Sequence, residues 1–140
     1  MRKKRIATVI AASMGAFALL STQAFAITWE TDVATATSSS SGGPWTWLKT
    51  DDVGAAFAAA GDWFFISDNR ADGMSADVQW QLKNSSGTLV RGGSIWMKEG
   101  AGDSRYKNKD FTEGYKLTWR VCRGKGTWVE HCSSYKTQTA

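Results

Sequence analysis

The sequence predicts an all-β protein, a small antiparallel β-sandwich of Ig-like or barrel-like form with one disulfide. Apolar and polar residues alternate with period two over much of the chain, and short turn signals interrupt that alternation repeatedly. In addition, the only two cysteines, Cys122 and Cys132, flank the turn-forming sequence RGKG. Seven or so short strands within about 95 residues are typical of a sandwich or small barrel.

Residues 1–26 have the three features of a secretory signal peptide. Charged residues at positions 2–5 precede an apolar run at 6–20, and the segment ends in Ala24-Phe25-Ala26. A charged start, a run of about 7 to 15 apolar residues and an A-x-A site are the parts of a cleaved signal. No later apolar stretch is long enough to span a bilayer. We expect cleavage after Ala26 and a secreted, extracellular protein; the alternative is an uncleaved membrane anchor.

Cleavage would leave a chain of 114 residues with no net charge. Four of the 17 basic residues lie in the signal segment, whereas all 13 acidic residues follow it, so 13 of each remain. Proteins that bind nucleic acid usually carry a surplus of basic residues for the phosphates, so we expect no nucleic-acid partner. A chain of this length suits one domain, and we expect a monomer.

The composition of residues 27–43 predicts where the β-sandwich domain begins. Residues 27–36 alternate weakly between apolar and polar, which suits an edge strand or an ordered arm. The sequence SSSSGG at 38–43 is typical of a flexible break. We therefore expect an N-terminal arm and Ser/Gly linker over residues 27–43, followed by the β-sandwich domain over residues 44–140.

Seven strands are expected in this domain, separated by turns rich in glycine, asparagine and aspartate. The first has a competing interpretation, because the alanines of DDVGAAFAAA at 51–60 favour a helix that Asp51 could cap. The strand ranges are 54–58, 62–67, 76–83, 93–98, 104–111, 115–123 and 127–135.

Alternation within two of these strands separates a core face from a solvent face. Burying an aromatic or branched side chain yields about 1.5 to 3 kcal/mol, whereas burying an unpaired charge costs more. The residues expected in the core are Val78, Trp80, Leu82, Leu117, Trp119 and Val121. The residues expected on the solvent side are Asp77, Gln79, Gln81, Lys83, Lys116, Thr118 and Arg120.

Cys122, Cys132 and the only histidine, His131, could form a metal site, a catalytic corner or a structural disulfide. Zinc needs about four protein ligands, or three and a water. His131 and Cys132 are neighbours whose side chains would point to opposite faces of a strand, which also disfavours a cysteine nucleophile. The RGKG turn instead brings the sulfurs together across a hairpin, where a disulfide stabilises by roughly 3 kcal/mol. We predict a Cys122–Cys132 disulfide, no metal and no other cofactor.

No convergent acid, base or nucleophile indicates an enzyme, and we assign no catalytic residue. Asp68 and Asp72 lie in DNRADG, whose spacing does not match a calcium loop, so we prefer a connecting turn to a calcium site. One alternative function is a glycan-processing enzyme that uses these two carboxylates with Trp63 as a platform. Another is a secreted protease inhibitor in which the RGKG turn presents Arg123 or Lys125 to a trypsin-like pocket.

Tryptophan is the most unusual component, because all eight tryptophans follow the signal segment. Core packing accounts for those in strongly apolar strands, but the pairs Trp45 with Trp47 and Trp96 with Trp128 have less reason to be buried. Exposed rings can stack on sugars or hold a protein. We predict that Trp45, Trp47, Trp96 and Trp128 bind a ligand, in a secreted, non-catalytic binding module for an extracellular protein, a glycan or another cell-envelope partner.

Residues 61–135 resemble a group of small exported actinobacterial proteins of uncharacterised function. The resemblance is carried by GDWFFISDNRADGMSADVQWQL, by KNKDFTEGYKLTWRVC and by a closing cysteine. Many members have His or Lys where this chain has Met74, and some have a second cysteine pair. The resemblance implies export, a sheet fold and a disulfide, and it supplies no catalytic residue. The matching residues are Gly61, Asp62, Trp63, Asp72, Gly73, Ser75, Trp80, Phe111, Glu113, Gly114, Cys122 and Cys132.

Overall fold

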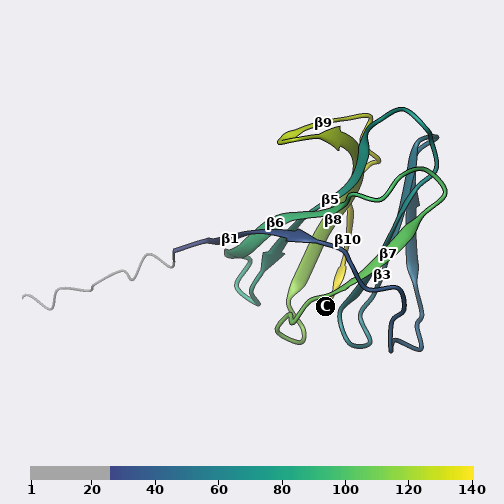
Figure 1. Ribbon diagram of the computed structural model, residues 1–140. Helices are drawn as coiled ribbons and strands as arrows, with labels where there is room; N and C mark the ends of the chain where they lie inside the picture. Colours follow the sequence, from purple (N-terminus) through teal and green to yellow (C-terminus); the bar gives the residue numbers. More distant parts are fainter. Residues whose placement is uncertain (1–25) are drawn as a thin grey trace, which may run out of the picture.

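Two sheets packed face to face contain the ten strands of residues 26–140, the part of the chain that the computed structural model describes (Figure 1). The signal peptide predicted over residues 1–26 lies outside this range except for Ala26. Sheet A consists of β1 (Thr28–Val33), β5 (Ser75–Lys83), β6 (Leu89–Met97), β8 (Lys116–Lys125), β9 (Trp128–Glu130) and β10 (Lys136–Thr139). Sheet B consists of β2 (Thr46–Lys49), β3 (Val53–Ala58), β4 (Trp63–Asp68) and β7 (Ser104–Asn108).

The predicted sandwich is confirmed, and it is not a closed barrel. Sheet A has the strand order β1-β6-β5-β8-β10 with β9 paired to β8, and sheet B has the order β2-β3-β4-β7. Neighbouring strands are antiparallel except β1, which runs parallel to β6. Each of the seven expected strands has a counterpart, whereas β2 and β10 were not predicted. The described residues include no helix that could cross a membrane.

Residues 53–58 form strand β3, and the competing helix is not seen. The strand lies between β2 and β4 in sheet B, and all six of its residues are buried. Val53, Ala55 and Phe57 face the core, so Ala56 and Ala58 face the other side of the sheet. Burial on both faces therefore outweighs the helix propensity of alanine here, since propensity is a weak prior beside tertiary packing.

The N-terminal segment belongs to the sandwich, which corrects the domain boundary that we placed at residue 44. β1 is an edge strand of sheet A, the first of the two forms that the sequence allowed for residues 27–36. Arg91 and the nearly buried Lys109 both form ion pairs with Glu30 of β1. A Cβ atom on Gly93 would lie 2.2 Å from the carbonyl oxygen of Glu30, so only glycine lets the two backbones approach so closely. These contacts hold the segment against the sheet.

The core lies between the two sheets and contains all six residues expected there, each at most 2 % exposed. Phe64 of sheet B meets Trp119 of sheet A edge to face, with ring centroids 5.6 Å apart. The prediction for Asp77 is wrong, because this residue is completely buried although it lies on the outer face of sheet A. Its partners across the sheet, Trp96 and Cys122, have side chains on the same face and are themselves buried.

The predicted disulfide is confirmed. Cys122 and Cys132 are joined with an S–S distance of 2.06 Å, and no described cysteine is free. The bond links β8 to the residues just after β9, across the hairpin that the RGKG turn closes. It therefore staples the end of sheet A where Asp77 lies beside Cys122.

Candidate binding site

A row of side chains on the outer face of sheet B supplies most of the candidate site. Trp47, Ala56, Phe65 and Tyr106 are partners in register across β2, β3, β4 and β7. Partners across an antiparallel pair lie on the same face, roughly 4.5 to 5.5 Å apart at Cβ. Phe64 is one residue away from Phe65 and lies in the core, so the row points away from the core.

The small side chain of Ala56 allows the aromatic rings of this row to touch. Ala56 lies between Trp47 and Phe65 and is fully buried. The ring centroids of Trp47 and Phe65 are 5.4 Å apart, and those of Phe65 and Tyr106 are 5.2 Å apart. A larger residue at position 56 would push the first two rings apart. The alanine-rich sequence of β3 therefore serves the aromatic contacts above it.

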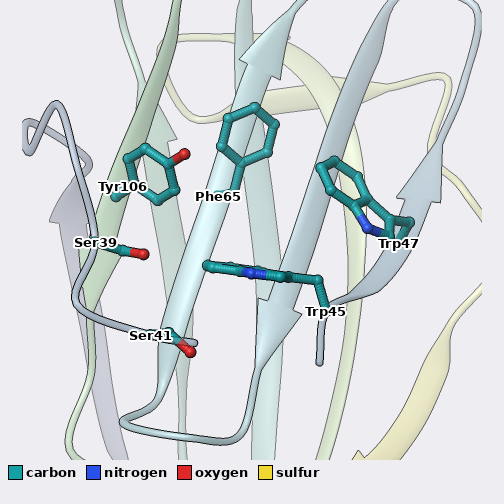
Figure 2. Close-up of a pocket in the computed structure, with 6 residues that line it drawn as sticks. All are labelled: Ser39, Ser41, Trp45, Trp47, Phe65 and Tyr106. Atoms are coloured by element: carbon teal, nitrogen blue, oxygen red, sulfur yellow. The ribbon is translucent and has the colours of Figure 1, made fainter. Parts of the chain in front are cut away.

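Trp45 and the linker before it complete a pocket of about 240 Å³ over this row (Figure 2). The ring of Trp45 lies 6.1 Å from that of Tyr106, at 60° to it. Figure 2 shows Trp45 edge-on below Phe65, with Ser39 and Ser41 on the side away from Trp47. The linker is anchored next to the pocket, because the Tyr106 amide donates to the Ala36 carbonyl at 2.8 Å. Part of the predicted flexible break therefore forms a pocket wall.

The pocket is neutral, and it combines apolar ring faces with hydrogen-bonding groups. No charged side chain is among its six lining residues, Ser39, Ser41, Trp45, Trp47, Phe65 and Tyr106. The Ser41 hydroxyl accepts a hydrogen bond from the Gly43 amide at 3.2 Å. Within residues 26–140, the Ser39 hydroxyl, the Tyr106 hydroxyl and the Trp45 indole N–H bond to no other protein group. These three groups can bond to a ligand or to water.

The structure brings together two of the four tryptophans that we predicted to bind a ligand. Trp45 and Trp47 share the pocket, and Trp47 is 62 % exposed. Trp128 is 56 % exposed but lies at the β8–β9 turn, outside the pocket. Trp96 is only 7 % exposed, so it does not form an exposed pair with Trp128. The reason is Gly124, whose missing side chain leaves room for the Trp96 ring, 3.0 Å from where a Cβ would lie.

Phe65, Tyr106, Ser39 and Ser41 are lining residues that sequence reasoning missed. Phe65 gave a usable signal, because Trp63-Phe64-Phe65 places adjacent aromatic side chains on opposite faces of one strand. Nothing in the sequence indicated the other three, since their position depends on how β7 and the linker pack against β4.

Ion pairs hold Arg123, one of the two basic residues of the protease-inhibitor alternative. Arg123 binds Asp72 at 3.1 Å and Glu130 at 2.6 Å, so its guanidinium is held on the protein instead of being presented by the turn. These contacts, with burial acting against them, raise the pKa of Arg123. Asp52 pairs with Arg70 at 2.8 Å, and this hydrogen bond lowers the pKa of Asp52.

Asp68, one of the two carboxylates of the glycan-processing alternative, lies far from its proposed platform, Trp63. Trp63 and Asp68 are the two ends of β4, which places them about 16 Å apart along the strand. Asp68 is buried, which raises its pKa, and it accepts the Arg70 amide at 3.0 Å. Asp72 likewise accepts the Met74 amide at 2.9 Å. Both are the contacts of connecting turns, and no cluster of three metal-ligating side chains lies within residues 26–140.

Comparison with known proteins adds no relative. No family model matches the chain, and neither the curated proteins nor the solved structures give a significant match. Function is therefore inferred from the chemistry of the pocket.

Proposed function

We propose that this chain is an exported, non-catalytic binding module that holds a cell-envelope or extracellular partner at the aromatic pocket of sheet B. The observation that carries the proposal is the collection of four aromatic side chains on the face of sheet B that the core does not use. Large aromatic side chains contribute most to stability when they are buried. Rings that remain at the surface in a group, beside unpaired hydrogen-bonding groups, are typical of a binding surface.

The lining supports binding more than catalysis. Its hydroxyl groups belong to serine and tyrosine, and the pocket offers them no histidine, lysine or carboxylate partner to act as a base. The only histidine is at 3.3 Å from Asp52, in the charged cluster near the end of β8. Hydrolysis by acid–base catalysis needs such partners within hydrogen-bonding reach of the reacting group.

Export is supported by the signal-like start of the sequence and by the disulfide. Disulfides form and persist in oxidising compartments, and a staple between two strands suits a small domain that works outside the cell. The exposed pocket would then face the envelope or the medium.

The proposal is tested by sedimenting purified residues 27–140 with an insoluble cell-wall preparation from a bacterium that exports the protein. We expect the wild type and Trp128→Ala to sediment with the wall, because Trp128 is exposed outside the pocket. The double variant Trp45→Ala/Trp47→Ala should stay in solution. Equal sedimentation of all three proteins would show that the pocket is not the binding site.

A further inference from the structure

The four rings of the pocket form a concave corner and not a flat platform. Trp47 and Phe65 are inclined at 62°, Phe65 and Tyr106 at 60°, and Trp45 and Tyr106 at 60°. A ligand in this corner therefore meets one ring by its face and others by their edges. Such a shape accepts a single small ring. A ligand with a flat, extended surface would instead need coplanar aromatic side chains.

The volume sets the size of the group that enters. At about 240 Å³ the pocket is smaller than the roughly 300 to 1,000 Å³ that holds drug-sized ligands. Because the pocket is open to solvent on the outer face of the sheet, a ring inside it can belong to a longer chain that continues outside. The pocket thus fits one unit of a polymer.

The lining sets the chemistry of that group. Ring faces line the pocket together with the free hydroxyls of Ser39 and Tyr106 and the indole N–H of Trp45. No basic side chain lines it to hold an anion, and no carboxylate lines it to hold a cation. Lys49 lies on the same face of β2, two residues beyond Trp47, but it is not part of the lining. The complementary ligand is uncharged, has an apolar face and carries hydroxyls at its rim.

We infer that the ligand is a neutral sugar unit of a polysaccharide chain, which stacks its C–H face on Trp45 and bonds through its hydroxyls to Ser39 and Tyr106. This inference rests on the proposed function and names its ligand class. A proline-rich peptide is another neutral ligand that aromatic side chains recognise. It needs an extended groove of successive ridges for its three-residue helical repeat, and the aromatic rings here close into one corner.

The test is native affinity electrophoresis of residues 27–140 through gels that contain one soluble neutral polysaccharide each. The panel is hydroxyethylcellulose, laminarin, glycogen, galactomannan and arabinogalactan, with polygalacturonate as the anionic control. A decaproline peptide, measured by fluorescence anisotropy of a labelled copy, covers the competing ligand. The variants are Trp45→Ala, Tyr106→Phe and Trp128→Ala.

We expect at least one neutral polysaccharide to retard the wild type and Trp128→Ala equally, and polygalacturonate to retard neither. Trp45→Ala should weaken this binding at least about tenfold, because it removes the stacking face. Tyr106→Phe keeps the ring and removes only the hydroxyl, so it should weaken binding by about three- to tenfold. If Trp45→Ala loses the near-ultraviolet circular dichroism of the native fold, Tyr106→Phe alone decides the question.

Three results would overturn the inference. Retardation that is unchanged in both pocket variants would place the sugar elsewhere on the protein. Decaproline binding that depends on Trp45, without retardation by any neutral polysaccharide, would refute the sugar while sustaining the proposed function. A wild type that binds no neutral polysaccharide and no decaproline would refute the sugar, and failure to sediment with cell wall would then refute a cell-envelope partner as well.

Discussion

Replacing Asp77 by asparagine should stabilise the protein at alkaline pH and change it little at acid pH. Asp77 lies on β5 between its cross-strand partners Trp96 and Cys122 and is completely buried. Neither of its carboxyl oxygens accepts a hydrogen bond from a described residue. Burial raises the pKa of Asp77 to about 7, although two nearby groups lower it in part: the Ile95 amide, which lies close but does not meet hydrogen-bond geometry, and the positive charge of Arg120.

The magnitude follows from the difference between folded and unfolded states. An unfolded aspartate has a pKa of 3.8, and a difference of about three pKa units corresponds to roughly 4 kcal/mol. The folded protein keeps the proton that the unfolded chain has already lost between about pH 4 and pH 7. The free energy of unfolding therefore falls as the pH rises through this window, and the full penalty is present above it. Set against a total stability of about 5 to 15 kcal/mol, this penalty is large.

The assay is urea unfolding with the disulfide intact, followed by tryptophan fluorescence at about pH 5 and about pH 8.5. We expect the wild type to lose about 2 to 4 kcal/mol between these pH values and Asp77→Asn to lose much less. Burial also raises the pKa values of Asp62 and Asp68, but those contributions are common to both proteins and cancel in the comparison. Asp103→Asn, at an exposed position, is the matched control. Parallel pH dependence of wild type and Asp77→Asn would refute the reasoning.

Three further predictions concern the staple and the N-terminal strand. Replacing both disulfide cysteines by serine should lower the free energy of unfolding by roughly 3 kcal/mol in urea titrations, and an unchanged midpoint would contradict a structural role. Lys109→Met removes a nearly buried cation from Glu30 and Asp32, so it should speed amide exchange throughout β1, whereas Lys125→Met at an exposed position should not. Gly93→Ala places a Cβ against the β1 backbone and should destabilise by about 1 to 3 kcal/mol in thermal melts. Gly100→Ala, which meets no atom within 4 Å, is its control, and equal melting temperatures would contradict the close contact.

The sequence predicted the strands whose two faces differ most. In β5 and β8 the core side is aromatic or branched and the other side mostly polar, and the alternation alone sufficed. β2 and β10 have only four residues each, which is too few for an alternation of apolar and polar residues to be distinguished from the neighbouring sequence. The burial of Asp77 could not be predicted for a different reason, because its neighbours Trp96 and Cys122 are brought beside it by the register of distant strands.

The sequence predicted the shared location of site residues only within the segment that contains both Trp45 and Trp47. Trp45 and Trp47 are close together after the linker, so their shared location could be inferred from local features. Phe65 and Tyr106 join them through the register of three strand pairs, and no local pattern encodes a register between distant strands. The neutrality of the pocket is likewise a property of the assembled face.

The same alanines explain both the ambiguous element and the site. As a local sequence, residues 51–60 favour a helix, because alanine has the highest helix propensity. In the structure, most of these residues form β3, an inner strand of sheet B. Ala56 of this strand contributes almost no volume to the outer face, and the rings of Trp47 and Phe65 meet above it. A residue with better strand propensity, such as valine, would fill that space and separate the rings. A strand that appears poorly suited to its local structure is thus consistent with a surface shaped for binding.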